Sequence, residues 1–167
     1  MRSRLFALMA APALMLAGCS GQMHGPTPRP AAKPLSITYA TGPCFGFCPV
    51  YTVTVSADGT GRFNGALNTS AKGPRDFKVS PAEFKAFADA LAPWRPVGDR
   101  RIAPGEPGCK QPATDLPSVT VDWKGAGPAG SLYFYYGCGQ EAPKGMANAL
   151  GHAPDALPIA AFIGEQP

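Results

Sequence analysis

Apolar and polar residues alternate along much of the chain from Leu35 onward, with the two-residue period of half-buried strands. The alternation predicts four short strands, within residues 35–39, 51–56, 61–63 and 77–79. Asp58 and Gly59 separate the second strand from the third, and both residue types tolerate the positive φ of a tight hairpin turn. We therefore expect these strands to form an antiparallel meander.

The period changes after Ser80, where a helix is predicted. Ser80, Pro81 and Glu83 form a capping box with proline at the first helical position. Four apolar residues then follow at helical spacing and form one stripe: Phe84, Phe87, Ala88 and Leu91. Pro93 ends the predicted helix. This stripe needs an apolar partner, and the inward face of the sheet is the obvious one.

Beyond a long connection rich in proline and glycine (residues 98–116), the alternation returns. It predicts two further strands, at 119–123 and 132–138, joined as a hairpin, and two short helices follow at 144–150 and 154–163. The predicted fold class is α+β: a single antiparallel sheet of about six strands with one main covering helix and short C-terminal helices. Residues 35–167 are expected to form a single domain.

The chain begins with features of an export signal. Arg2 and Arg4 precede an apolar run over residues 5–16, which is too short for a membrane-spanning helix of about 20 residues. The stretch that ends the run, Leu16-Ala17-Gly18-Cys19, resembles the lipobox of bacterial lipoproteins. That resemblance implies a signal peptide over residues 1–18 and acylation of Cys19, for example by palmitate, which would fix the chain to the membrane. The alternative is ordinary cleavage and release, with Cys19 as a spare thiol.

The segment after the cleavage site predicts a tether. Residues 19–34 hold the lipidated Cys19 and four prolines, a composition that favours an extended chain over a packed core. Ser20 follows the cysteine, and by resemblance to Gram-negative lipoproteins this favours the outer membrane, with the domain facing the periplasm. The whole chain has a net charge of +4, but Arg2, Arg4, Arg29 and Lys33 all precede the domain, which leaves 11 basic against 11 acidic residues. Without a basic excess, nucleic-acid binding is not expected.

Four cysteines fall within the predicted domain, and an even count in an oxidising compartment favours disulfides. Three pairings are possible, and we prefer Cys44–Cys48 with Cys109–Cys138. The first would close a loop of about five residues and the second a loop of about 30, which in the loop-entropy model stabilises the fold by roughly 2 and 3.6 kcal/mol. Cys109–Cys138 would then be the main covalent staple.

The stretch from Cys44 to Pro49 also has a functional interpretation. Cys-x-x-x-Cys-Pro looks like the copper-binding motif of Sco-type assembly factors, in which two thiolates ligate Cu(I) or exchange disulfides. A strand pattern follows Pro49 where such sites open a helix, and the only histidines are His24 in the tether and His152 near the end of the chain. A structural disulfide is therefore favoured, and a periplasmic thiol-redox or copper-binding protein using Cys44 and Cys48 stays as the alternative.

Several stretches together resemble the domain-of-unknown-function 6438 family of bacterial exported proteins. They are Gly42-Pro43-Cys44-Phe45-Gly46-Phe47-Cys48-Pro49-Val50-Tyr51, Asp58-Gly59, Phe63-x-Gly65, Thr114-Asp115-Leu116-Pro117-Ser118 and Pro154-Asp155-Ala156-Leu157. The resemblance implies a small α+β domain, often in a predicted lipoprotein. It implies no activity, substrate or catalytic residue.

Two aromatic pairs are candidate contact residues for an envelope protein partner. Phe45 and Phe47 flank Gly46, and either both pack on neighbouring loops, which is favoured, or one faces solvent. Tyr133 and Tyr135 face opposite to the apolar side of the last strand, so either the terminal helices cover them, which is again favoured, or a partner does. Such a partner would lie against this strand or its edge, as in strand addition. No catalytic residue, metal ligand or cofactor is expected. The sequence predicts an envelope-anchored lipoprotein with a non-enzymatic binding or structural domain.

Overall fold

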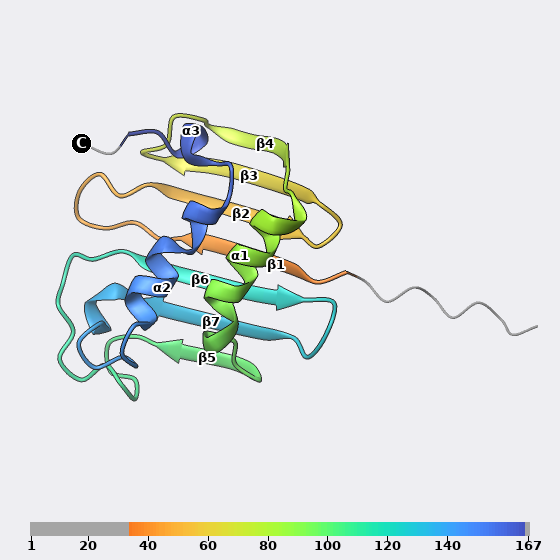
Figure 1. Cartoon of the computed structure of the whole chain (residues 1–167). Helices are drawn as coiled ribbons and strands as arrows, with labels where there is room; N and C mark the ends of the chain where they lie inside the picture. The colour runs from red at the N-terminus through yellow and green to blue at the C-terminus, as the bar shows by residue number, and fades with distance from the viewer. Residues whose placement is uncertain (1–33, 166–167) are drawn as a thin grey trace, which may run out of the picture. The chain divides into compact units, whose positions relative to one another are not determined.

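The computed structural model describes residues 34–165, and the signal peptide (1–18), the lipidation site Cys19 and nearly all of the tether lie outside that range. The described chain contains one sheet in the order β4-β3-β2-β1-β6-β7-β5, with helices on one face (Figure 1). Its strands are β1 (Ser36–Thr41), β2 (Val50–Ser56), β3 (Thr60–Leu67), β4 (Gly73–Lys78), β5 (Gly98–Ile102), β6 (Ser118–Lys124) and β7 (Gly130–Tyr135). The α+β class is confirmed, with seven strands in place of about six. The expectation of a wholly antiparallel sheet is wrong, because β5 pairs in parallel with β7.

The antiparallel meander β1-β2-β3-β4 is confirmed, with strands a few residues longer than the alternation indicated. The register places Ile37 opposite Val55 and Val53 opposite Phe63, so the apolar residues share one face. In the β2–β3 turn, the carboxylate of Asp58 accepts hydrogen bonds from the Thr60 hydroxyl (2.6 Å) and backbone N–H (3.0 Å), which lower the pKa of Asp58. The tight turn is therefore closed by its own aspartate.

Strand β5 was missed by the sequence analysis, which treated residues 98–116 as one connection. It pairs in parallel with β7, with Arg101 opposite Tyr133 and Ile102 opposite Phe134. Three of its five residues are charged, Asp99, Arg100 and Arg101, so no alternation marks it. Its existence follows from the neighbour that it joins at the sheet edge and not from its own composition.

The main helix α1 (Pro81–Leu91) forms as predicted. The N–H of Glu83 donates to the Ser80 hydroxyl (3.2 Å), and the N–H of Ser80 donates to the Glu83 carboxylate (2.7 Å), which completes the capping box and lowers the pKa of Glu83. Phe87 and Leu91 are buried against the sheet. A single 3-10 turn, η1 (Ala92–Trp94), continues past the expected stop at Pro93.

The C-terminal segment is helical as predicted but in shorter pieces. They are α2 (Met146–His152), η3 (Ala153–Ala156) and α3 (Ala160–Ile163), and a further 3-10 turn, η2 (Tyr136–Cys138), lies where a strand was expected. The last predicted strand therefore ends at Tyr135, because the chain turns into η2 and the N–H of Tyr136 donates to Pro117 O (3.0 Å). Within residues 34–165, no helix combines the length and apolarity needed to cross a bilayer.

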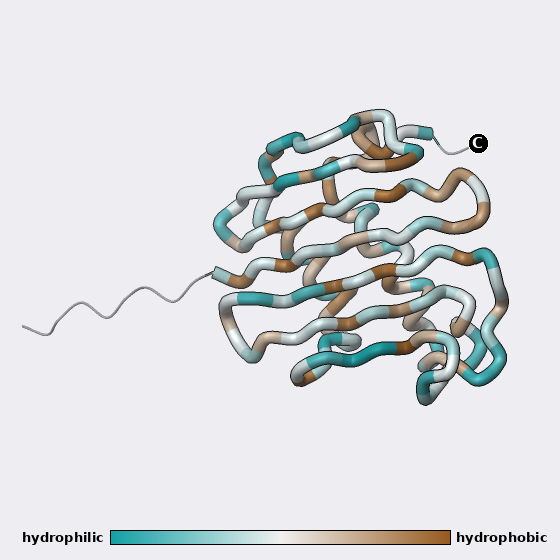
Figure 2. Tube along the Cα trace, turned by 180° about the vertical axis from the view of Figure 1, so that it is seen from behind, coloured by the Kyte–Doolittle hydropathy of each residue, from teal (hydrophilic) through white to brown (hydrophobic). Residues whose placement is uncertain are grey.

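The terminal helices pack on the same face of the sheet as α1, and not on the face of Tyr133 and Tyr135. The expectation that they cover these tyrosines is wrong. Met146 and Leu150 of α2, together with Ile159, complete the one core that α1 already shares with the sheet. Figure 2, seen from behind, shows that no helix crosses the central strands on the other side. We call that side the open face.

The core lies between the sheet and the helices and is rich in aromatic rings. Tyr39, Tyr51 and Phe63 form a row across β1, β2 and β3, with ring centroids 6.3 and 5.2 Å apart. The hydroxyl of Tyr39 donates to Leu150 O (2.9 Å) and so connects the sheet to α2. Burial raises the pKa of both the Tyr39 and the Tyr51 hydroxyl, so both stay neutral and serve packing.

Candidate functional site

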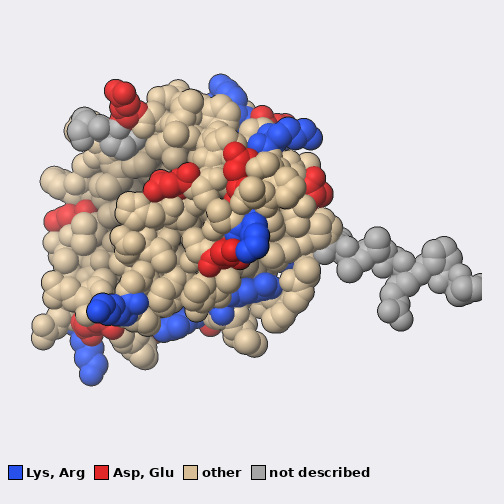
Figure 3. Space-filling view, viewed as in Figure 1, with Lys and Arg blue, Asp and Glu red and all other residues tan. Residues whose placement is uncertain are grey.

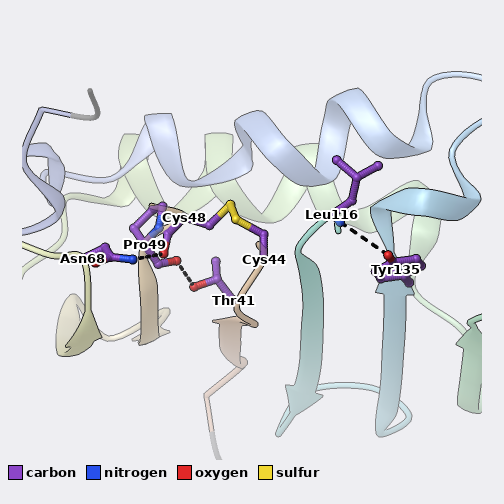
Figure 4. Close-up of a disulfide and its surroundings, with 7 residues drawn as sticks. All are labelled: Thr41, Cys44, Cys48, Pro49, Asn68, Leu116 and Tyr135. Carbon is purple, nitrogen blue, oxygen red and sulfur yellow. Dashed lines mark hydrogen bonds between the residues drawn. A yellow bond between two sulfur atoms is a disulfide. The ribbon is translucent and has the colours of Figure 1, made fainter. Parts of the chain in front are cut away.

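Residues 42–49, here called the Cys loop, connect β1 to β2 at one end of the sheet, and Cys44 and Cys48 are joined by a disulfide (Figure 4). The β1 side supports the loop through Thr41, whose hydroxyl donates to Pro49 O (2.8 Å) and accepts from the N–H of Tyr51 (2.9 Å). Directly after β3, the side-chain amide of Asn68 donates to Cys48 O (3.2 Å). These bonds hold the Cys48 end of the disulfide ring against the neighbouring strands.

A second segment, residues 114–117 before β6, braces the other side of the Cys loop. The N–H of Phe45 donates to Asp115 O (3.2 Å), and the N–H of Gly42 donates to Ser118 O (2.8 Å). Asp115 has a φ of 67°, which turns its carbonyl toward the loop. The N–H of Leu116 in turn donates to the Tyr135 hydroxyl (3.4 Å). The fold thus brings together two distant stretches on which the family resemblance depends.

Phe45 and Phe47 both project into solvent, with 88% and 73% of their surface exposed. The favoured expectation that both pack on neighbouring loops is wrong. A disulfide ring of five residues has no interior that could hold a phenyl ring, and Gly46, with a φ of 144°, reverses the chain between the two phenylalanines. The loop therefore displays two aromatic rings to solvent.

Two leucines extend this surface. Leu67 ends β3 opposite Val50 and is 57% exposed, and Leu116 beside Asp115 is 40% exposed. Within residues 34–165, these two and the two phenylalanines are four of the five exposed large hydrophobic residues. We call the set Phe45, Phe47, Leu67 and Leu116 the apolar end patch. Residues 34–35, which lead into β1, lie at the opposite end of that strand.

The second disulfide is a buried staple. Cys109, in the connection after β5, is bonded to Cys138 in η2, and both side chains are fully buried, so the preferred pairing is present. The carboxylate of Glu141 adds a polar clamp beside it, because it accepts hydrogen bonds from the N–H groups of Lys110 (2.9 Å) and Gln111 (2.6 Å). These bonds lower the pKa of Glu141. The clamp and the disulfide together fix the long connection to the end of β7.

The surroundings of Cys44 and Cys48 differ from those of a thioredoxin-like site. Cys48-Pro49 leads into strand β2, and the two sulfurs, which are half-buried, are bonded to each other. In the described part of the chain, no group of three or more His, Cys, Asp or Glu side chains converges to hold a metal ion. His152 pairs with Asp155 on the surface (2.9 Å). A surface depression of about 510 Å³ lies on the open face toward the other end of β2, lined by residues such as Thr54, Arg62 and Lys78.

The four predicted contact residues are not brought to one place. Phe45 and Phe47 form the apolar end patch with two leucines that the sequence analysis missed, while Tyr135 braces Leu116 beside it. Tyr133 lies farther along β7 on the open face, where the guanidinium of Arg101 stacks 4.0 Å from its ring centroid. Strand addition at β7 is excluded, because β6 and β5 occupy both of its edges.

These features define a small α+β domain with one sheet, helices on one face, and a disulfide-fastened loop at one sheet end. The family model described as "Domain of unknown function (DUF6438)" matches residues 35–155, from the start of β1 through most of η3, and the chain belongs to this family. No curated protein matches the chain.

Proposed function

We propose that this chain is a lipoprotein of the bacterial envelope whose folded domain is a non-enzymatic binding module. The observation that carries the proposal is the apolar end patch, which places exposed aromatic rings on a loop held by a disulfide and by two strands. Large apolar side chains that lie exposed together at one end of a domain are typical of an interaction site. A rigid loop also loses little conformational entropy when a partner binds. The partner in this proposal is another envelope protein with an apolar docking surface.

The polar side chains around the patch favour binding over catalysis. Thr41, Asn68 and Tyr135 each donate to or accept from a backbone group of the loop or its brace. Their hydrogen-bonding capacity therefore serves to position the Cys loop. A catalytic constellation would instead direct such groups toward a substrate position.

Membrane anchoring through Cys19 is the second part of the proposal. The lipobox-like Leu16-Ala17-Gly18-Cys19 supports it. We expect radiolabelled palmitate to enter the expressed wild-type chain and the Cys44→Ala variant, and not the Cys19→Ala variant. Labelling of the Cys19→Ala variant at the wild-type level would contradict the anchor.

A thiol-redox or copper-binding role for Cys44 and Cys48 is the second candidate. It is favoured by the half-exposed position of this disulfide, which contrasts with the buried Cys109–Cys138 pair. Thiol titration of natively purified protein distinguishes the two functions. A passive binding module is expected to show no titratable thiols without denaturant and no reduction by a mild monothiol. Free thiols on Cys44 and Cys48 in fresh material, or copper that co-purifies and is lost in Cys44→Ala, would favour the second candidate.

A further inference from the structure

The strand β5 forms one edge of the sheet and pairs only with β7 among the described strands. The N–H of Gly98 donates to Ala129 O (3.4 Å), toward β7. In a parallel pair, the backbone groups of successive residues point alternately to the two sides of the strand. Arg100 and Ile102 therefore also face β7, while the N–H and C=O groups of Asp99 and Arg101 face outward. Four backbone groups are thus directed at the free edge.

The two edges of the sheet differ in how they are protected. On β4, Pro74 lacks a donor, and the residues before the strand are bound by α3, where Ser70 and Ala71 donate to Ile163 O and Phe162 O (3.0 and 2.9 Å). Strand β5 contains no proline, and its residues 98–101 are exposed. Val97, directly before it, is 90% exposed, the fifth exposed large hydrophobic residue of the described chain. The β5 edge is therefore the more open of the two.

The charged side chains of β5 determine which partner strand can pair with this edge. Arg100 and Arg101 are consecutive, so their side chains point to opposite faces and flank the free backbone row from both sides. Asp99 lies on the same face as Arg101. With two arginines and one aspartate, the strand carries a net charge of +1. Figure 3 shows basic side chains along the lower border of the molecule, where Figure 1 places β5. Opposite charges in facing positions stabilise a strand pair, and like charges destabilise it.

We propose that β5 is a strand-addition site for an extended segment of a partner protein that carries adjacent acidic residues. The partner backbone bonds to Asp99 and Arg101, its acidic pair lies beside Arg100 and Arg101, and an apolar residue at its end contacts Val97. A second copy of this chain fits poorly, because two β5 edges in antiparallel contact bring arginines together. The chain's own residues 20–33 contain Arg29 and Lys33 and no acid, so they lack the required charge. This site is separate from the apolar end patch and does not depend on it.

The test uses the full chain in detergent and two synthetic eight-residue peptides of valine and threonine around a central pair, Glu-Glu in one and Lys-Lys in the other. Peptide binding is followed by amide hydrogen exchange with NMR detection. With the Glu-Glu peptide, exchange is expected to slow at Asp99 and Arg101 and to stay unchanged at Arg100 and Ile102, which already bond to β7. The Lys-Lys peptide is expected to bind at least about tenfold more weakly.

Two variants separate strand addition from simple charge attraction. The double variant Arg100→Glu with Arg101→Glu is expected to reverse the preference of the two peptides. The single variant Arg101→Pro removes an outward donor and leaves the ladder to β7 intact, so it is expected to weaken binding of the Glu-Glu peptide. Equal binding of both peptides, protection away from β5, no binding up to millimolar peptide, or dimerisation through β5 in light scattering would overturn the proposal. A Phe45→Ser variant is expected to bind the peptides like the wild type.

Discussion

Replacing both Cys109 and Cys138 with alanine is expected to lower the free energy of unfolding by about 3.6 kcal/mol, the value for a loop of about 30 residues. For a domain of this size, that corresponds to a fall in Tm of roughly 10–15 °C. The disulfide holds the connection after β5 against η2, so its loss also releases the clamp at Glu141. Chemical denaturation of the oxidised proteins, with the double variant beside the wild type, measures the effect.

The Cys44→Ala, Cys48→Ala double variant is the matched control, since it removes a disulfide that closes a loop of only about five residues. Its expected loss is smaller, about 2 kcal/mol. The hydrogen bonds from Thr41 and Asn68 remain and still hold the Cys48-Pro49 end of the Cys loop. Equal losses for the two variants, or a larger loss for the Cys44–Cys48 pair, would show that the buried disulfide is not the main staple.

The sequence predicted those elements whose determinants are local. Ser80, Pro81 and Glu83 specify the start of α1 within four residues, and Asp58-Gly59 specifies a turn within two. Strand β5 was not predicted, because Asp99, Arg100 and Arg101 show no alternation of apolar and polar residues. It is a strand only through its pairing with β7. The opposite error occurred at Tyr136 and Cys138, where alternation continued but the disulfide to Cys109 and the bond to Pro117 O turn the chain. Long-range contacts override local pattern in both cases.

The candidate site was predictable in its covalent part and not in its surface. Four cysteines allow only three pairings, and the preferred one is the one that the structure contains. The exposure of both Phe45 and Phe47 was missed, because phenylalanine is most often a core residue. Only the small size of the disulfide-closed loop, five residues, shows that it has no interior for a phenyl ring. Leu67 and Leu116 join the patch only through the strand register and the brace at Asp115, which no local pattern encodes.

The double variant Phe45→Ser, Phe47→Ser is expected to weaken capture of the envelope partner by roughly 30-fold or more, because aromatic anchors that each contribute about 1–2 kcal/mol account for most of the energy of such an interface. Its free energy of unfolding should stay within about 0.5 kcal/mol of the wild type, since both side chains contact mainly solvent. Photo-crosslinking from position 116, which belongs to the same patch and is unchanged in the variant, is carried out in intact cells, and quantification of the crosslinked product measures the loss.

The control for this prediction is Val97→Ser, because Val97 is equally exposed but lies at the opposite end of the sheet. This variant should leave crosslinking from position 116 unchanged. Crosslinks to lipid alone, together with vesicle binding by the Cys19→Ala chain that is lost in the double phenylalanine variant, would identify the patch as a membrane contact and contradict a protein partner. Because the disulfide fixes both rings at the strand end, reduction of Cys44–Cys48 in the wild type should weaken crosslinking as well, while the Cys109–Cys138 staple keeps the domain folded.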